Sequence, residues 1–437
     1  MGEIPVIIIT LTLFIALLSI GLHISTVLLL SGIVGIYLLS GVQALTGILE
    51  LDPFNRVASY TLTTIPLFIL MSQFIMHADI VKYLYSLVFK LTRGVSSVLG
   101  VFTILLGGFL GAVSGSGSAI SASLGQIAVP ELKKRGYKED LAGAIAAVSG
   151  SLSSIIPPAI GLIIYGALTQ TPIGDLFIAS IIPGILMIII FIIVLMFLHK
   201  RSKREVIETE EAQSIELDNY SAKQYTVAIL TGLFIVGAIF GGIYLGIFTP
   251  TEAGAVGAFI SLITAAILGK VNVNFIKKSL RSTLEITTMV MVIMIGAQVF
   301  GKFISLSRIP RKVLEMLEPL MGMPLLIIIL LLIIYFILFM FLEGAAVILM
   351  TVPITVPLAQ AVGISPLEFG ILISAIGTAG LLTPPVGLCV YSVAGVTKIP
   401  IENLFKYSLI FATAASIAVP AILLNFPELM TFLVNNK

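Results

Sequence analysis

The sequence predicts an all-α membrane protein with many spanning helices. Of its 437 residues, 58% are hydrophobic and only 11% are charged, whereas soluble domains carry about 25% charged residues. Apolar stretches near the ~20 residues that cross a bilayer recur along the whole chain. The clearest are 5–22, 25–40, 60–76, 177–198, 225–247, 253–269, 284–301 and 325–342. A membrane β-barrel would instead show short alternating segments, so we expect a multi-pass protein of the cell (inner) membrane, in contact with the lipid bilayer.

A polar segment at 199–224 divides the chain into two halves that share one skeleton of prolines and glycines. Thirteen residues separate Gly117 from Pro130 in the first half and Gly344 from Pro357 in the second. Twenty-seven residues then lead from each of these prolines to a Pro-Pro pair, at 157–158 and 384–385. Matching spacings at several points indicate an internal repeat.

The distribution of positive charge indicates that the two repeats have opposite orientations. The loop after the first skeleton's Gly-to-Pro segment, 133–140, reads KKRGYKED, whereas its counterpart at 359–368, AQAVGISPLE, has no Lys or Arg. Basic loops stay in the cytoplasm, so inverted-topology repeats account for the difference. The linker 199–224 is then cytoplasmic and both termini lie outside, which puts about 18 of the 24 Lys and Arg residues inside. The basic run 308–312 falls outside and is the main exception.

Each repeat contains a glycine-rich tip that we interpret as the turn of a re-entrant helical hairpin. The first tip, within AVSGSGSAISAS at 112–123, follows an apolar run, and the second is Glu343–Gly344–Ala345. Non-helical backbone survives at membrane depth only when protein or a wet cavity surrounds it. Each tip precedes a helix whose free N–H groups suit an anion. Hydroxyls of Ser114, Ser116 and Ser118 add ligands for a carboxylate or for Na⁺.

Each repeat also contains a spanning helix that a Pro-Pro pair interrupts, in SGSLSSIIPP at 149–158 and IGTAGLLTPP at 376–385. Proline removes a backbone donor, so carbonyls near each break are free. Together with the hydroxyls of the nearby serines and threonines, these carbonyls are hard oxygen ligands for Na⁺. The hydroxyls are those of Ser149, Ser151, Thr378 and Thr383.

Structural explanations compete with these functional ones. A single Gly/Ser-rich stretch is equally typical of close helix packing in membranes, and a single Pro-Pro is typical of a kink. Four interruptions in two matched pairs favour a central binding site. Glu343 has two open interpretations, a helix N-cap and an ion- or proton-coupling group. Glu252 is expected to cap a helix at the interface.

Other site classes find little support. Cys389 is the single cysteine, which excludes an internal disulfide and a thiolate metal site. His23, His77 and His199 lack metal-ligand spacing. Protease, hydrolase and nucleotide-binding motifs are missing, so we expect no enzyme activity, no organic cofactor and no nucleic-acid partner. A channel remains an alternative, although paired breaks at the midplane favour alternating access.

Four stretches resemble the large membrane subunit (DctM-like M subunit) of the tripartite ATP-independent periplasmic (TRAP) transporters, in the ion transporter superfamily. They are GIFTPTEAGAVGA at 246–258, SGSGSA with the following VPELKKRGY, SGSLSSIIPPAIGLIIYG and GLLTPPVGLCVYSVAG, and the similarity runs over essentially the whole chain. The resemblance implies a scaffold domain that holds a mobile, elevator-type transport domain. It implies Na⁺-coupled uptake of an organic acid as solute. It also implies two partners, a small four-helix membrane subunit (Q-type) and an extracytoplasmic solute-binding protein (P-type).

The resemblance also assigns site residues. A first Na⁺ site would lie between the first tip and the first break, with Ser114, Gly115, Ser116, Ser149, Gly150 and Ser151. A second would lie between the second tip and the second break, with Glu343, Gly344, Gly377, Thr378, Gly380 and Thr383. The solute would sit between the tips, against Ser116, Gly117, Ser118, Ser151, Glu343, Gly344, Ala345 and Thr378.

These expectations divide the chain as follows. The first inverted repeat, 1–198, would consist of scaffold helices at 1–78, an arm at 79–94, a hairpin at 95–131, and a broken helix with the following helix at 139–198. The second, 225–437, would consist of scaffold helices at 225–304, an arm at 305–322, a hairpin at 323–358, and a broken helix with the last helix at 366–437. The leading hypothesis is the Na⁺-coupled large subunit. The alternative is a self-sufficient cation-coupled anion or dicarboxylate transporter of the same fold, without partner subunits.

Overall fold

The computed structural model describes residues 3–91, 96–114, 116–202 and 220–436, and every regular element in these ranges is helical. Nine helices among them are long and apolar enough to cross a membrane. Large apolar side chains are exposed along their outer faces, for example Ile193, Phe197 and Phe234. Exposed side chains of this kind suit a lipid environment. The prediction of an all-helical, multi-span membrane protein is therefore confirmed.

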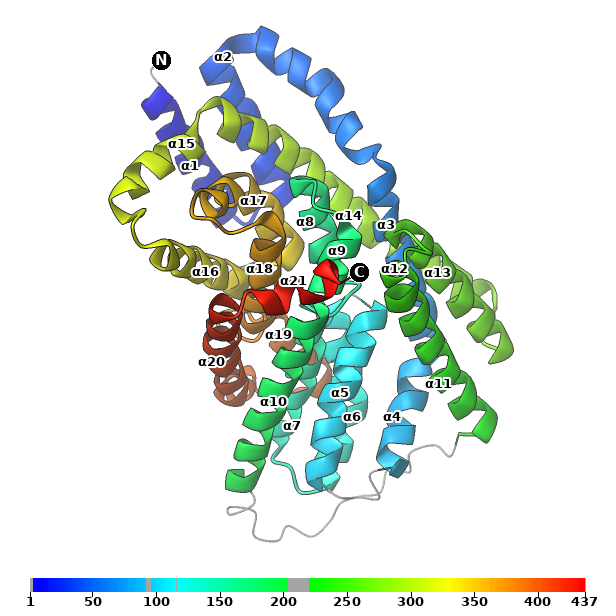
Figure 1. Ribbon diagram of the computed structural model, residues 1–437. Coiled ribbons are helices and arrows are strands. Elements are labelled where there is room, and N and C mark those ends of the chain that lie inside the picture. Colours follow the sequence, from blue (N-terminus) through cyan, green and yellow to red (C-terminus); the bar gives the residue numbers. More distant parts are fainter. Residues whose placement is uncertain (1–2, 92–95, 115, 203–219, 437) are drawn as a thin grey trace.

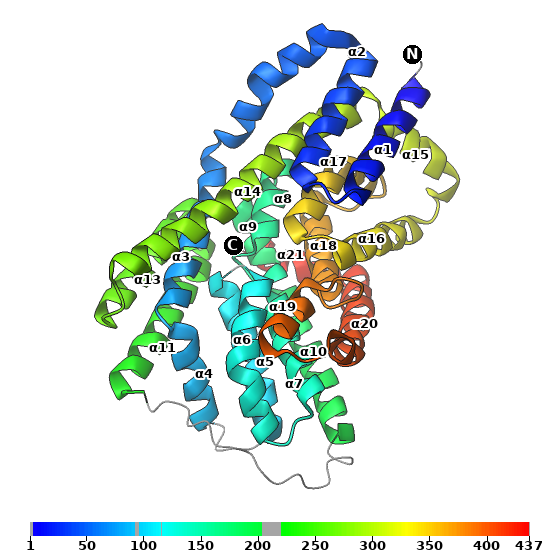
Figure 2. The same cartoon turned by 180° about the vertical axis from the view of Figure 1, so that it is seen from behind.

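One group of helices forms a long frame along one side of the molecule (Figures 1 and 2). It contains α1 (Glu3–Ser19), α2 (Ile24–Val57), α3 (Thr64–His77), α11 (Ala222–Val236), α13 (Pro250–Ile267) and α14 (Val273–Leu306). Helix α2 packs along α14, and α3 packs along α13. Gly32 allows the first of these contacts, because a Cβ there would lie 2.8 Å from the backbone nitrogen of Phe300. Small residues at such contacts let membrane helices approach closely.

Two amphipathic helices lead from this frame to the rest of the chain. They are α4 (Ile80–Leu91) and α15 (Ile309–Leu317). Each follows a residue in the left-handed region, Asp79 with φ 60° and Arg308 with φ 53°. Asp79 is held by Lys270 and by Lys82, each with a 2.7 Å N–O distance. The predicted arms at 79–94 and 305–322 contain these two helices.

Two helical hairpins follow the arms. The first consists of α5 (Ser96–Ser114) and α6 (Gly117–Lys134), and the second of α16 (Pro324–Phe341) and α17 (Gly344–Ala361). The second helix of each hairpin, α6 or α17, continues past its prolines. Each ends three residues beyond the predicted bound, which was 131 for the first hairpin and 358 for the second. Proline inside these helices is tolerated because neighbouring protein surrounds them. The turns fall where the sequence predicted the tips.

Each hairpin is followed by a helix that is interrupted at its Pro-Pro pair. Helix α7 (Glu139–Ser151) passes through a short 3₁₀ turn (Leu152–Ser154) before α8 (Ile160–Thr169) begins. In the second half α18 (Pro366–Gly380) and α19 (Leu388–Thr397) flank the corresponding break. Both breaks contain a cis Pro–Pro bond. The chain continues through α9 (Ile173–Ala179) and α10 (Ile181–Ser202) in the first half, and through α20 (Ile401–Asn425) and α21 (Glu428–Asn435) in the second.

Backbone conformation repeats between the halves in a nearly constant register. Left-handed residues precede both arms (Asp79 and Arg308), follow both hairpins (Gly136 and Gly363) and end both broken helices (Gln170 and Lys398). The members of these pairs are 227 to 229 residues apart. Because non-glycine residues seldom adopt this conformation, the agreement supports the internal repeat that the proline spacing predicted.

At the centre of the molecule, the hairpin of each half packs against the broken helix of the other half. Helix α6 of the first hairpin packs on α19, and α17 of the second hairpin packs on α8. The Tyr165 hydroxyl of α8 donates a 2.6 Å hydrogen bond to the carbonyl of Pro366 at the start of α18. A Cβ on Gly370 would lie 2.5 Å from the Tyr165 ring, so glycine at this position admits the ring. The hairpins and broken helices thus form one packed body.

The helix cap predicted at Glu252 is confirmed. The Glu252 carboxylate accepts 2.8 Å and 2.9 Å hydrogen bonds from the backbone nitrogen and hydroxyl of Thr249. The Thr249 hydroxyl accepts in turn from the Glu252 nitrogen. This reciprocal capping box begins α13.

We predict that Thr249→Ala lowers the free energy of unfolding by about 1 kcal/mol, because it leaves N-terminal amide groups of α13 without their cap. Thermal unfolding of the purified protein in detergent measures the change. Thr413→Ala is the control, since Thr413 is exposed and bonds within its own helix. Equal melting temperatures for the two variants would contradict the prediction.

Candidate functional site

A pocket of about 260 Å³ lies where both hairpin tips and both helix breaks meet. The tips contribute Ser116, Gly117, Ser118, Glu343, Gly344 and Ala345. The breaks and their flanks contribute Ser153, Ser154, Ile160, Gly161, Gly377, Leu381, Leu388 and Cys389. The frame closes the pocket with Ile69, Ser72 and Gln73 of α3 and with Ile286, Met289 and Val290 of α14. Segments that are far apart in the sequence therefore share one cavity, as the paired interruptions predicted.

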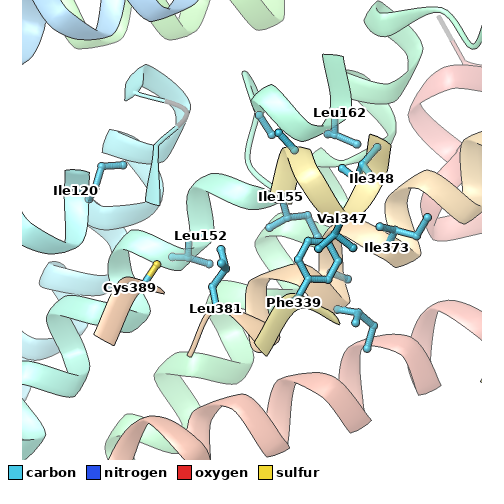
Figure 3. Packing of buried hydrophobic residues seen from close by; sticks show 14 of the residues in the cluster. Ile120, Leu152, Ile155, Leu162, Phe339, Val347, Ile348, Ile373, Leu381 and Cys389 are labelled. Atoms are coloured by element: carbon cyan, nitrogen blue, oxygen red, sulfur yellow. The ribbon is translucent and has the colours of Figure 1, made fainter. Parts of the chain in front are cut away.

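Part of the pocket lining is apolar and includes Phe339, Leu381 and Cys389. Figure 3 shows these side chains together with Leu152, Ile155 and Val347 of the apolar core. All six side chains are buried. Ligand pockets are typically lined by apolar side chains with a few placed polar groups.

The first tip presents uncapped backbone groups to the pocket. Helix α6 begins at Gly117 after Ser116, whose side chain makes no capping hydrogen bond. The Ser116 and Ser118 hydroxyls lie 3.4 Å apart. The first turn of α6 can therefore bind an anionic group through its free N–H groups. Gly115 and the side chain of Ser114 lie outside the described residues.

The second tip carries its own cap. A carboxylate oxygen of Glu343 accepts a 3.0 Å hydrogen bond from the backbone nitrogen of Ala345. The capping interpretation of Glu343 is thus confirmed, and the residue also lines the pocket. Among the described lining residues, Glu343 is the one acidic side chain, and Lys, Arg and His are missing.

Oxygen atoms converge between the first tip and the first break. A Cβ on Gly117 would lie 3.1 Å from both the Gly150 carbonyl oxygen and the Ser153 hydroxyl. A Cβ on Gly150 would in turn lie 2.5 Å from the Gly117 carbonyl oxygen. Carbonyl and hydroxyl oxygens are the ligands that Na⁺ takes in broken-helix transporters, so the residues present here fit that ion.

Two predicted ligands of the first break are buried beside this cluster and do not line the pocket. The Ser149 hydroxyl donates to the Ile145 carbonyl at 2.7 Å, and the Ser151 hydroxyl donates to the Val148 carbonyl at 2.9 Å. A hydroxyl that donates its proton keeps oxygen lone pairs for a cation. Ser151, which we predicted to contact the solute, is completely buried.

The second break also packs against its hairpin through glycine. A Cβ on Gly380 would collide with Phe339 of α16 and one on Gly377 would lie 3.0 Å from it, so these glycines admit that side chain. The hydroxyls of Thr378 and Thr383 donate to their own helix, at Ser374 (3.0 Å) and Ala379 (2.9 Å). Of these four predicted site residues, only Gly377 lines the pocket.

Five polar lining residues were missed at the sequence level. Ser153 and Ser154 belong to the same serine-rich run as Ser151, and their position two or three residues further on places them at the cavity. Ser374 lies one helical turn before Thr378. Ser72 and Gln73 lie within an apolar spanning segment. Two adjacent polar residues in such a segment were the signal that could have identified them as lining residues.

Known proteins with similar sequences indicate the family of this chain. Residues 11–429 match the family model "Tripartite ATP-independent periplasmic transporter, DctM component". The sialic acid TRAP transporter large permease protein SiaM of Vibrio cholerae is 30% identical over 85% of this chain and 87% of its own length. The C4-dicarboxylate TRAP transporter large permease protein DctM of Pseudomonas aeruginosa is 30% identical over 83% of each chain.

A solved structure shares the fold. The Alcanivorax borkumensis YdaH transporter superposes with a TM-score of 0.65 over 89% of this chain and 90% of its own, at 14% sequence identity. At that identity the likeness concerns the fold alone. The family match over nearly the whole chain is decisive for the protein class: this chain belongs to the DctM components of the tripartite ATP-independent periplasmic transporters, and it is a transporter permease, not an enzyme.

Proposed function

We propose that this chain is the large membrane subunit of a Na⁺-coupled secondary transporter that imports a carboxylate solute. The observation that carries the proposal is the single pocket on which both hairpin tips and both helix breaks open. Helix N-termini attract anions, and the described lining contains no cationic side chain. A carboxylate in this pocket would therefore need positive charge from bound ions, and the neighbouring oxygen cluster suits Na⁺.

The ions would occupy two sites related by the internal repeat. The first would use Ser114, Gly115, Ser116, Ser149, Gly150 and Ser151, and the convergence of Gly117, Gly150 and Ser153 supports its location. The second would use Glu343, Gly344, Gly377, Thr378, Gly380 and Thr383. The solute would bind between the tips. The names of the two relatives, for sialic acid and C4-dicarboxylate, support an organic acid as solute.

Transport would follow an elevator mechanism. The frame supplies one wall of the pocket from α3 and α14, while the hairpins and broken helices supply the rest. A pocket on the boundary between two bodies can change sides when one body slides along the other. The frame with the predicted ranges 1–78 and 225–304 would stay fixed, and 95–198 with 323–437 would move on the two arms. Inverted repeats with opposite loop charge support this mechanism, with the linker 199–224 in the cytoplasm and both termini outside.

Two further components would complete the system. The family description is tripartite and periplasmic, and the relatives are named large permeases. These names support a small four-helix membrane subunit and an extracytoplasmic solute-binding protein as partners.

We expect uptake of sialic acid or succinate into proteoliposomes only when the small subunit, the binding protein and an inward Na⁺ gradient are all present. Radiolabelled uptake measures it. Replacing Na⁺ by K⁺ on both sides is the control. Equal uptake in K⁺ would reject Na⁺ coupling, and uptake by the large subunit alone would favour the self-sufficient alternative.

We expect Gly150→Ala to abolish uptake, because the added methyl group would collide with Ser121 and with the Gly117 carbonyl. The matched control is Gly395→Ala, where a methyl group would meet nothing within 4 Å. Size-exclusion chromatography in detergent checks that both variants fold. Normal uptake by a folded Gly150→Ala protein would remove the first ion site from the proposal.

Glu343→Gln separates the two roles of this residue. Glutamine retains an acceptor for the Ala345 nitrogen but loses the charge, so the helix cap should survive. We expect the half-saturating Na⁺ concentration to rise about tenfold, as for the loss of one charged ligand interaction. Glu368→Gln is the control, since Glu368 caps α18 at its far end from the break. Unchanged Na⁺ dependence would leave Glu343 as a cap only.

A further inference from the structure

A second cavity lies between the frame and the second hairpin. Its volume is about 400 Å³, which is large enough for a small organic acid. Helix α14 contributes Ala297, Gln298, Gly301, Lys302 and Ser305, and α17 contributes Val352, Pro353, Val356 and Pro357. The end of α8 closes it. Lys302 is the one charged side chain among the described lining residues.

The internal repeat relates this cavity to the wall of the solute pocket. In the alignment of the two repeats, Asp79 corresponds to Arg308. The same alignment makes His77, the last residue of α3, correspond to Leu306, the last residue of α14. In the same register Ile69 corresponds to Gln298, Ser72 to Gly301 and Gln73 to Lys302. The three α3 residues line the solute pocket, and the three α14 residues line the second cavity.

The space beside the same part of α3 in the first repeat is nearly closed. Ser72 and Met76, which correspond to Gly301 and Ser305, line with Ile120 and Ser123 of the first hairpin a space of only about 10 Å³. The two repeats therefore differ: α14 and α17 are in contact but leave about 400 Å³ between the frame and the second hairpin. Inverted repeats that exchange conformations would reverse this difference. The exchange would bring the second tip along α14 to Gln298 and Lys302.

We propose that Gln298 and Lys302 form the frame wall of the solute pocket in the opposite transport state, where Ile69 and Gln73 form it in the structure described here. This inference rests on the proposed function. The wall would then differ in charge between the two states, with the ammonium group of Lys302 on one side and the uncharged amide of Gln73 on the other. Lys302 lies near the C-terminal end of α14, whereas the ion pair of Lys270 with Asp79 lies just before its N-terminal end. A carboxylate would thus be bound more tightly on the outer side and released more readily on the inner side.

Cysteine cross-linking tests the geometry without a solute. Gln298→Cys with Ala345→Cys should be joined by a bifunctional maleimide in membranes that contain the whole transporter, and mass spectrometry detects the joined peptides. Ile69→Cys with Ser118→Cys, which line the same pocket in this structure, is the positive control. Each single variant controls for reaction at native Cys389. Formation of the control product without the 298–345 product, with and without Na⁺, would overturn the proposal.

Uptake kinetics test the charge. We expect Lys302→Gln to raise the half-saturating concentration of the transported acid, sialic acid or succinate, about tenfold, as for one lost charge-assisted hydrogen bond. Lys302→Arg should restore the affinity. Gln73→Lys should lower the maximal rate, because it would hold the acid on the release side. An unchanged half-saturating concentration in Lys302→Gln would overturn the charge assignment. If the unaltered transporter shows no Na⁺-driven uptake, the proposed function fails, and the cross-link alone decides whether the pocket reaches Lys302.

Discussion

The need to satisfy backbone polar groups away from water determines the centre of this molecule. Two tips and two breaks leave N–H and C=O groups without helical partners, and lipid offers none. At the second break neighbouring helices supply the missing partners. The backbone nitrogens of Val386 and Gly387 in the second break donate to the Met340 carbonyl at the end of α16. The Ser408 hydroxyl donates to the Leu382 carbonyl at 2.9 Å, so the second break is stabilised from two neighbouring helices.

The same constraint explains why the pocket combines polar groups with an apolar lining. Helix ends that must be buried bring carbonyls, hydroxyls and helix N-termini together. Apolar residues such as Phe339 and Leu381 pack around these groups. Glycine is required where two of these ends touch. At Gly150 the approach is so close that a Cβ would lie 2.5 Å from the Gly117 carbonyl oxygen and collide with Ser121. Binding chemistry and packing are therefore produced by the same residues.

The sequence predicted the interruptions accurately and the orientation of their side chains poorly. Glycine and paired prolines break helices for local reasons, so the tips and breaks at 114–118, 343–345, 149–158 and 376–385 could be located from composition and spacing. Which hydroxyl faces the cavity depends on how each helix is rotated against its neighbours. Ser153 and Ser374 line the pocket, whereas Ser151 and Thr378 do not, although the hydroxyls of Ser374 and Thr378 both donate to carbonyls of α18. The prolines at 130 and 357 misled the prediction of helix ends, because surrounding protein tolerates them within α6 and α17.

The crossed contacts between the halves also bear on how the chain reaches its native state during synthesis. Helix α6 packs on α19, and α8 packs on α17, so the surfaces that α6 and α8 bury in the finished protein are completed only by segments of the second half. A membrane protein made from its N-terminus must keep the first hairpin and the first broken helix in the bilayer before their partners exist. Until then the unpaired N–H and C=O groups of the first tip and the first break, which later border the pocket, must find hydrogen-bond partners in water, in lipid headgroups or in the insertion machinery. Truncation anywhere before α19 would therefore leave the first half inserted but without a finished interior.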